Sequence, residues 1–344
     1  MPDVVAVGDA NVDIIAHFPA YPSKGEDALA HSTEIHCGGS AANTAIALAR
    51  MGINVSLISR VGPDSWALKV LSCLNEAGVD PQGLQRDSVT MTGLMYVIVT
   101  PDGERTIFGD RGANVRTDPS QIRAEEIQQA RVLHLSGYAL LAEPQRSAAL
   151  QAFETARQNR LSVTLDPGMS LPHVALQDLQ ALLPAVHILL PSLTEAQQLT
   201  GRREPQACAQ ALLAAGVQVV ALKLGRDGCL VYSTSGSLRV PGFAVDTLDS
   251  TGAGDAFAAG FIAGFLDGLD WHSVAVLGNA LGAMAAAQVG AGTGVTEAQK
   301  VLASLGDYFD NSSQSESQEA IRRVSQFIEK LATASSEEER PWWT

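Results

Sequence analysis

The sequence predicts an α/β fold in which a mostly parallel sheet is covered by helices on both faces. Apolar runs typical of buried strands recur along the chain, at 4–8, 55–62, 132–137, 162–167, 187–192 and 219–225. The segments between them show helical periodicity, as in 149–160 and 204–216. Strands and helices that alternate in this way form parallel sheets with both faces buried. Ligands of such sheets bind beyond the carboxyl ends of the strands, and the predicted strands end at or near Gly8, Asp166, Ser192 and Gly225.

Three segments depart from this alternation and read as strands of a second, smaller sheet. They span 12–19, 28–39 and 93–114, and the third contains Pro-Asp-Gly-Glu at 101–104, which predicts a hairpin turn. The small sheet is either an edge extension of the core or a lid over the functional site. We predict a lid, with its strands within 12–39 and 93–114.

The chain changes character after residue 306. A polar stretch at 310–319 precedes apolar residues that share one face of a helix, namely Ile321, Val324, Phe327, Ile328 and Leu331. The last residues, 335–344, read as a disordered tail. We therefore predict a main domain over 1–306 and an appended, non-catalytic helix and tail over 307–344.

Charge and cysteine content argue against several classes of protein. The formal net charge of −14, with no basic run, argues against a surface for nucleic acid or an anionic membrane. The cysteines lack a Cys-x-x-Cys spacing, which predicts packed or incidental thiols in a reducing compartment; they are Cys37, Cys73, Cys208 and Cys229. The N-terminus reads as a strand rather than a signal peptide, and the stretch 273–292 as a buried helix rather than a membrane span. We predict a cytoplasmic protein.

The stretch Gly252-Ala253-Gly254-Asp255 is the first that suggests chemistry. A helix that begins here points unpaired backbone N–H groups outward, and small residues let an anion approach them. This is an anion hole suited to a transferring phosphoryl group, and the adjacent Asp255 could accept a proton from an attacking hydroxyl. The alternative is a flexible turn before a core helix, and this stretch alone does not decide between the two.

A second glycine-rich stretch lies at 38–62. Gly38 and Gly39 precede an Ala-rich helix that carries Asn43 early in its course. The glycines permit a ligand to approach the backbone, and Asn43 offers a donor and an acceptor that suit sugar hydroxyls. The alternative is a tight loop before a core helix.

Together the two stretches resemble the signatures of the ribokinase-like (PfkB) carbohydrate kinase family. The first matches at Gly38, Gly39, Asn43, Ala45, Gly52 and Gly62, and the second at Asp249, Thr251, 252–255, Ala259 and Gly260. The similarity runs from residue 4 to about residue 305. It implies a Rossmann-like three-layer α/β domain with a small β-sheet lid, and transfer of the γ-phosphoryl group of ATP to a sugar-like alcohol.

The resemblance also implies roles for individual residues. Asp255 corresponds to the base, Gly252, Ala253 and Gly254 to the anion hole, and Asp13 to the acid that holds substrate hydroxyls. The positions that bind the nucleotide are Lys223, Gly225, Gly228 and Asn279, with Asn279 against the adenine. As isolated residues, Lys223 could be a surface charge and Asn279 a buried helix contact.

One position departs from the family pattern. The family has Asn-x-x-Glu where this chain has Ser192-x-x-Glu195. Glu195 keeps a role for Mg²⁺ through water, whereas Ser192 lacks an amide, which puts its phosphate contact in doubt. The resemblance also makes K⁺ a candidate ligand, bound by backbone carbonyls near Asp249 and Thr251 on one side and by the loop 286–295 on the other.

The sequence leaves the acceptor open. Arg111 could pair with the carboxylate of a sugar acid or be a solvent-facing lid charge, and the other candidate selectors are His17, Phe18, Tyr96, Arg105, Phe108, Asn114 and Tyr138. The alternatives to a sugar kinase are a nucleoside kinase of the same family and a catalytically weak sugar-binding protein. A nicotinamide dehydrogenase is weaker, because the first strand lacks Gly-x-Gly-x-x-Gly. A homodimer through the lid is a further candidate.

Overall fold

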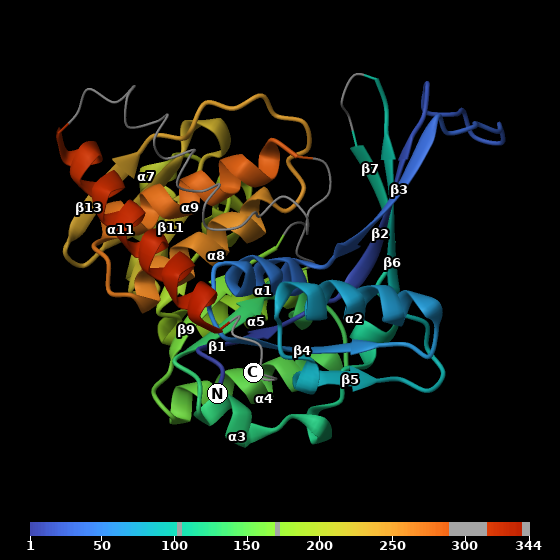
Figure 1. Ribbon diagram of the computed structural model, residues 1–344, viewed down its shortest axis with the longest axis horizontal. Coiled ribbons are helices and arrows are strands. Elements are labelled where there is room, and N and C mark those ends of the chain that lie inside the picture. Colours follow the sequence, from blue (N-terminus) through green and yellow to red (C-terminus); the bar gives the residue numbers. More distant parts are fainter. Residues whose placement is uncertain (102–104, 169–172, 289–314, 339–344) are drawn as a thin grey trace.

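Two β-sheets organise the chain, and Figure 1 shows the smaller one standing away from the larger. The computed structural model describes residues 1–101, 105–168, 173–288 and 315–338. In this part of the chain the large sheet has the order β13-β12-β11-β10-β9-β8-β1-β4-β5. Neighbouring strands run parallel from β11 to β5, while β12 and β13 are antiparallel at one edge. The strands are β1 Val4–Val7, β4 Val55–Val61, β5 Leu84–Arg86, β8 Val132–Ser136, β9 Ser162–Asp166, β10 Ile188–Leu189, β11 Val219–Lys223, β12 Cys229–Ser233 and β13 Gly236–Val240.

Helices cover both faces of the large sheet, as predicted. Along β1, Val4 and Ala6 belong to one buried cluster and Val5 and Val7 to the other, because successive side chains of a strand point to opposite faces. The first cluster contains side chains of α1 Ser40–Arg50, α2 Ser65–Ala77, α8 Ala253–Leu266 and α9 Trp271–Ala286. The second contains side chains of α3 Ala124–Gln128, α4 Gln145–Gln158, α5 His173–Leu182, α6 Leu193–Thr200 and α7 Pro205–Ala214. Short 3₁₀ helices are η1 Pro81–Gly83, η2 Gly112–Arg116, η3 Pro119–Gln121, η4 Gly137–Leu140, η5 Leu183–Ala185 and η6 Gly225–Asp227.

The helix α9 occupies most of the Ala- and Gly-rich stretch predicted to be a buried helix. Its residues Val274, Leu277 and Leu281 are fully buried against the rest of the first cluster. Among the helices of the described residues, none combines the length and the apolar character needed to cross a membrane. Positions 289–292 of the predicted helix lie outside the described residues.

The small sheet has the strand order β3-β2-β6-β7. Its strands are β2 Asn11–His17, β3 Ser32–Gly38, β6 Gly93–Val99 and β7 Arg105–Asp110. The pair β2–β6 is parallel and the outer pairs are antiparallel. The predicted turn at 101–104 lies mostly outside the described residues. Since β2 follows β1 after a short connection and β3 leads into α1, the base of this sheet lies beside the core.

The prediction that the cysteines are packed or incidental thiols is wrong for two of them. Cys37, at the end of β3, forms a disulfide with Cys73 in α2, across a sequence separation of 36 residues. Cys208 and Cys229 are free and buried. The pair forms because the end of the small sheet packs on α2, a tertiary contact that spacing cannot reveal. The disulfide removes the cysteine argument for a reducing compartment.

A C-terminal helix, α11 Ser315–Glu338, packs on α9. Four of the five residues predicted to share its apolar face are buried, Ile321, Val324, Phe327 and Ile328, and Leu331 packs against them in part. Arg323 and Lys330 bind Asp270 and Asp267 at the ends of the α8–α9 connection, at 2.7 and 2.6 Å. The predicted disordered tail spans 335–344, but α11 continues to Glu338, so this prediction is wrong for residues 335–338. Residues 339–344 and 307–314 lie outside the described residues.

Candidate active site

The two glycine-rich stretches meet at the carboxylate of Asp255. Ser40 Oγ donates a hydrogen bond to Asp255 Oδ1 at 2.8 Å, and Asn43 Nδ2 donates to Oδ2 at 2.8 Å. Ser40 and Asn43 lie at the start of α1, and Asp255 lies in the first turn of α8. The two helices approach closely because their facing residues are small: both helices bury several alanines, among them Ala41, Ala45 and Ala259.

The first turn of α8 has the features of an anion site. Gly252 is its N-cap residue with a φ of 76°, a left-handed conformation that favours glycine, and no side chain caps the turn. The Ala253 N–H donates to the Ser250 carbonyl at 3.3 Å, whereas the N–H groups of Gly254 and Asp255 belong to the turn that no side chain caps. These groups can meet a ligand, and the helix dipole adds partial positive charge there. A Cβ atom placed on Gly254 would lie 3.3 Å from Lys223 Nζ, so an ammonium group stands beside the same turn.

Burial and charge adjust the Asp255 carboxyl for proton transfer. Burial raises its pKa to about 6, and the nearby charge of Asp166 acts in the same direction. The hydrogen bonds from Asn43 and Ser40 and the charge of Lys223 lower it and limit the rise. A carboxylate with a pKa near neutrality suits a general base.

In the described part of the chain, two side chains near Asp255 carry oxygens without a hydrogen-bond partner. Within the described residues, Asp13 Oδ1 and Asn43 Oδ1 are buried and accept no hydrogen bond. Burial raises the pKa of Asp13 to about 7, and the charges of Asp255 and Asp249 add to this effect. A Cβ atom on Gly38 would lie 2.1 Å from Asp13 Oδ1, which explains glycine there, and Gly39 is the N-cap residue of α1. Buried acceptors without donors fit the hydroxyl groups of a ligand.

Lys223 connects this site to the ends of β9, β10 and β11. Its Nζ donates to Asp166 Oδ2 at 2.7 Å. Burial opposes its charge, but the carboxylates of Asp166 and Glu195 outweigh burial and raise the pKa of Lys223. Asp166 was not among the predicted site residues, although an acid at the carboxyl end of a buried strand is a signal that could have identified it.

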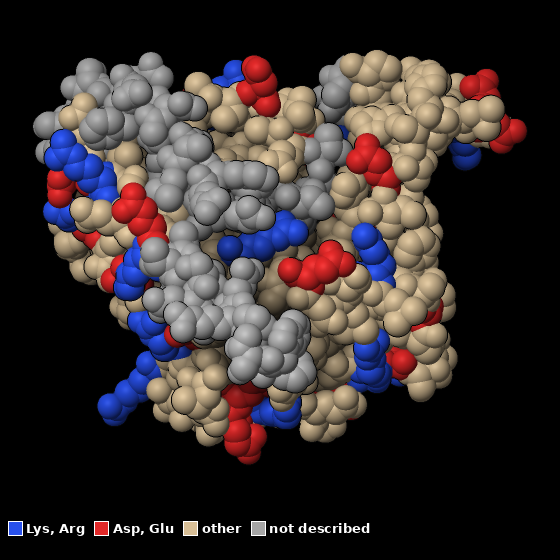
Figure 2. All heavy atoms as spheres, viewed as in Figure 1, with Lys and Arg blue, Asp and Glu red and all other residues tan. Residues whose placement is uncertain are grey.

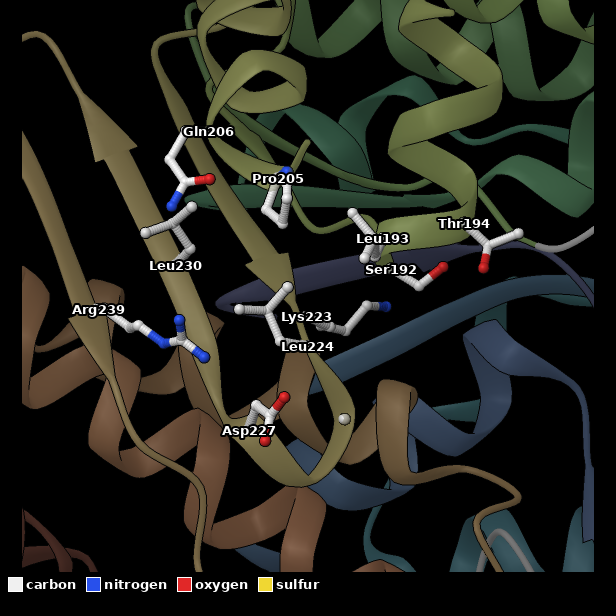
Figure 3. Close-up of a pocket in the computed structure, with 11 residues that line it drawn as sticks. Ser192, Leu193, Thr194, Pro205, Gln206, Lys223, Leu224, Asp227, Leu230 and Arg239 are labelled. Atoms are coloured by element: carbon white, nitrogen blue, oxygen red, sulfur yellow. The ribbon is translucent and has the colours of Figure 1, made fainter. Parts of the chain in front are cut away.

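A cavity of about 350 Å³ opens beside Lys223 (Figure 3). Ser192 and Thr194 lie on one side of the view, Gln206, Leu230 and Arg239 lie on the other, and Lys223 lies between them. Gly225 also lines the cavity, at the turn that joins β11 to β12. Three of the predicted nucleotide-binding residues, Ser192, Lys223 and Gly225, therefore share one hollow.

Ser192 and Glu195 form a capping box at the start of α6. Ser192 Oγ accepts from the Glu195 N–H at 3.3 Å, and Glu195 Oε2 accepts from the Ser192 N–H at 2.7 Å. Burial raises the pKa of Glu195, and the charge of Asp166 adds to the rise. Serine is thus a suitable residue for this position as a helix cap, whatever it contributes to a ligand.

Comparison with known proteins places the chain in a family. The model of the pfkB family of carbohydrate kinases matches residues 1–298. The chain belongs to this family. An ATP-dependent ribose-1-phosphate kinase from Halopiger xanaduensis is 33% identical over 89% of this chain and 99% of its own length.

Solved structures share the fold of this kinase. The Arabidopsis thaliana ribokinase complexed with ribose and ATP has a TM-score of 0.78 at 24% identity, covering 88% of this chain and 98% of its own. A ribokinase-II-type protein from E. coli in complex with ATP and Mg²⁺ has a TM-score of 0.82 at 23% identity, covering 89% of this chain and 100% of its own. The predictions of the α/β fold, of the family and of a phosphotransferase acting on sugar hydroxyls are confirmed.

Other predicted ligand-binding residues of this kinase are engaged within the chain. Arg111 donates to both carboxylate oxygens of Asp9, at 2.7 and 2.8 Å, to the Tyr138 carbonyl at 2.8 Å and to Gln145 Oε1. The ring of Tyr138 packs next to Gly168. Arg111 is therefore neither a free partner for a substrate carboxylate nor a solvent-facing lid charge.

Asn279 and Gly228 both contact the chain that leaves β13. Asn279 Nδ2 donates to the carbonyls of Val240 and Pro241 at 3.2 and 3.0 Å. A Cβ atom on Gly228 would lie 2.1 Å from the Val240 carbonyl oxygen. Both residues thus shape the segment after β13, and any contact of theirs with adenine remains a prediction.

The residues predicted to bind K⁺ lie next to the anion site. Asp249 Oδ1 accepts from the Thr251 N–H at 2.8 Å and from Thr251 Oγ1 at 2.6 Å. Arg105 binds the same oxygen. Residues 289–295 of the second predicted loop lie outside the described residues, so potassium stays a prediction. No group of three or more metal-ligating His, Cys, Asp or Glu side chains occurs in the part of the chain that the structure describes.

Proposed function

We propose that this kinase transfers the γ-phosphoryl group of ATP to a hydroxyl group of a sugar, with Asp255 as the general base. The observation that carries the proposal is the position of the Asp255 carboxylate. It lies in the first turn of α8 and is held by Ser40 and Asn43, so that a base stands beside an uncapped helix N-terminus.

The proposed step balances as a simple displacement. The acceptor hydroxyl gives its proton to a carboxylate oxygen of Asp255 while its oxygen forms a bond to the γ-phosphorus. The bond from that phosphorus to the β–γ bridging oxygen breaks, and ADP leaves. Asp13 and Asn43, with their unpartnered oxygens, orient the acceptor by accepting hydrogen bonds from its other hydroxyls.

Charge that develops on the transferring group meets fixed positive partners. N–H groups of the turn 252–255 are the proposed donors at the start of α8, that of Ala253 being shared with the Ser250 carbonyl, and Lys223 stands beside Gly254. Such preorganised donors stabilise the transition state without reorganising during the reaction. Ser192, Gly225 and Gly228, with Asn279, are the residues that we propose for the rest of the nucleotide.

The carboxylates of Asp166, at the end of β9, and Glu195, in the first turn of α6, suit a Mg²⁺ ion that is held through water. Glu195 and Asp166 are buried carboxylates, and the charge of Asp166 raises the pKa of Glu195. Among the described residues, Lys223 is the cation that acts on both. Two carboxylates do not complete an octahedral shell, which matches a metal that keeps waters and phosphate oxygens as ligands. When bound, the metal would neutralise charge on the phosphates.

The acceptor belongs to the sugars or phosphorylated sugars. The Halopiger relative is named a ribose-1-phosphate kinase, and the Arabidopsis structure holds ribose. A coupled assay of ADP release with ATP, Mg²⁺ and K⁺ tests this on pentoses, hexoses, keto-sugar acids, sugar phosphates and nucleosides. We expect turnover with at least one sugar or sugar phosphate. Turnover with nucleosides alone would favour a nucleoside kinase, and ATP binding without any turnover would favour a sugar-binding protein.

We also propose that two copies pair through the outer face of the small sheet. The side chains of Ile35, Tyr96 and Phe108 are exposed. They lie in one row across the small sheet, because the strand register pairs Ile14 with both Ile35 and Tyr96, and Tyr96 with Phe108. Sedimentation velocity of the Phe108→Glu variant tests this. We expect a dimer for the wild type and a monomer for the variant, and an unchanged sedimentation coefficient would contradict it.

A further inference from the structure

Arg105 links the small sheet to the loop that precedes α8. It is the first residue of β7, and its guanidinium donates to Asp249 Oδ1 at 2.5 Å and to Ser250 Oγ at 2.7 Å. Asp249 and Ser250 lie just before Gly252 in the sequence. A cation carried by the small sheet therefore reaches the edge of the proposed phosphoryl-transfer site.

Arg105 lies on the face of the small sheet that carries Asp13. Asp13 pairs with Met95, and Met95 with Gly109, so these residues form one row across the sheet. Side chains alternate along a strand, so positions 105, 107 and 109 of β7 share a face. Asp13 and Arg105 thus both face the acceptor side of the site.

The acceptor side is rich in negative charge. The negative charges of Asp255 and Asp249 both raise the pKa of Asp13. Carboxylates are good acceptors for the hydroxyls of a neutral sugar, and such a ligand requires no cation. An anionic ligand would be repelled from this side unless a cation met it.

Other cations near the site are more deeply buried than Arg105: the side chains of Arg111 and Lys223 are 18% and 15% exposed. Arg111 is surrounded by Asp9, Gln145 and the Tyr138 carbonyl, and Lys223 binds Asp166 on the nucleotide side. The Arg105 side chain keeps 28% of its surface exposed. Asp249 Oδ1 also accepts two hydrogen bonds from Thr251, so its hydrogen bonding does not depend on Arg105.

We propose that Arg105 binds a phosphate group carried by the acceptor sugar. The proposal rests on the proposed function, because it names the acceptor class of the same site. A guanidinium presents five N–H donors in a planar fork that matches phosphate oxygens, and only some of them are needed by Asp249 and Ser250. The acceptor class is accordingly a phosphorylated sugar, and Arg105 is the residue that distinguishes it from the neutral sugar.

The test compares ribose 1-phosphate with ribose as acceptors for the wild type, Arg105→Gln and Arg105→Lys. Loss of a charge-assisted contact predicts a roughly 10- to 100-fold fall in kcat/KM for ribose 1-phosphate in Arg105→Gln, mostly through KM. The fall for ribose should be at least tenfold smaller, and Arg105→Lys should recover part of the loss. Arg157→Gln is the control for net charge, because Arg157 is an exposed residue of α4 that binds Glu154.

Binding measured by calorimetry separates this proposal from the proposed function. If no sugar or sugar phosphate of the full panel is phosphorylated, the proposed function fails, but weaker binding of ribose 1-phosphate to Arg105→Gln than to the wild type would still support the role of Arg105. Equal binding of ribose 1-phosphate to the two proteins would overturn it. An equal fall in kcat/KM for both acceptors would also overturn it, since Arg105 would then serve the transferring group or the position of the small sheet.

Discussion

Asn43 donates a hydrogen bond to Asp255 at 2.8 Å, although 212 residues separate the two in the sequence. The bond joins the start of α1 to the start of α8 and leaves the Asn43 oxygen without a partner in the described residues. One side chain therefore holds the proposed base and offers an acceptor to a ligand hydroxyl. This arrangement explains why the candidate active site lies where two small-residue helices begin side by side.

Replacing Asp255 by Asn should remove the base while keeping its size. We expect kcat to fall about 100-fold or more, the effect of losing general-base catalysis, while ATP binding measured by calorimetry stays close to wild type. Asp267→Asn, at the other end of α8, is the matched control and should keep its activity. Near-normal turnover of Asp255→Asn would remove Asp255 from the mechanism.

The pH dependence of kcat/KM should follow the Asp255 carboxyl. Burial raises its pKa to about 6, so the base form is lost below that pH and kcat/KM should rise with pH through it. The carboxyl of Asp13 has a pKa of about 7 and interacts with that of Asp255. The acid limb of the pH profile therefore reports the two carboxyls together. In Ser40→Ala a hydrogen bond that lowers the pKa is lost, so the limb should move to higher pH.

The control for this shift is Ser72→Ala, which removes an exposed hydroxyl of α2 that binds Glu76. Its pH profile should match the wild type. A Ser40→Ala profile that matches as well would show that another group sets the limb.

The large-sheet architecture and the center of the site could be predicted because local patterns encode them. Apolar strand runs and helical periodicity identified β1, β4, β8, β9, β10 and β11, and two short signatures identified 252–255 and Asn43. The strand β5 was missed because it has only three residues.

Pairings between distant residues could not be predicted in this way. Arg111 forms an ion pair with Asp9, and Arg105 forms one with Asp249. Each pair depends on how the small sheet packs against the core. The Cys37–Cys73 disulfide has the same origin. A sequence pattern describes the neighbours of a residue along the chain, whereas these contacts arise from tertiary packing.

Replacing Glu195 by Gln should raise the Mg²⁺ concentration needed for half-maximal ADP release. The amide oxygen can still accept from the Ser192 N–H, so the capping box is largely kept while the charge is lost. Ser192→Ala is the converse change: it should cost about 1 kcal/mol of stability through the lost cap and leave the Mg²⁺ titration nearly unchanged. An unchanged titration in Glu195→Gln would discard the role of Glu195 with Mg²⁺.

Replacing Cys73 by Ser should destabilise the chain by opening the Cys37–Cys73 link between the small sheet and α2. The disulfide closes a loop with a sequence separation of 36 residues, and a loop of that size corresponds to about 4 kcal/mol in the chain-entropy model. Urea unfolding with and without a reductant measures the difference. The reduced wild type should unfold like the variant, because both lack the cross-link. If the reductant leaves the wild-type curve unchanged and thiol titration counts four free thiols, the two cysteines are not joined in solution.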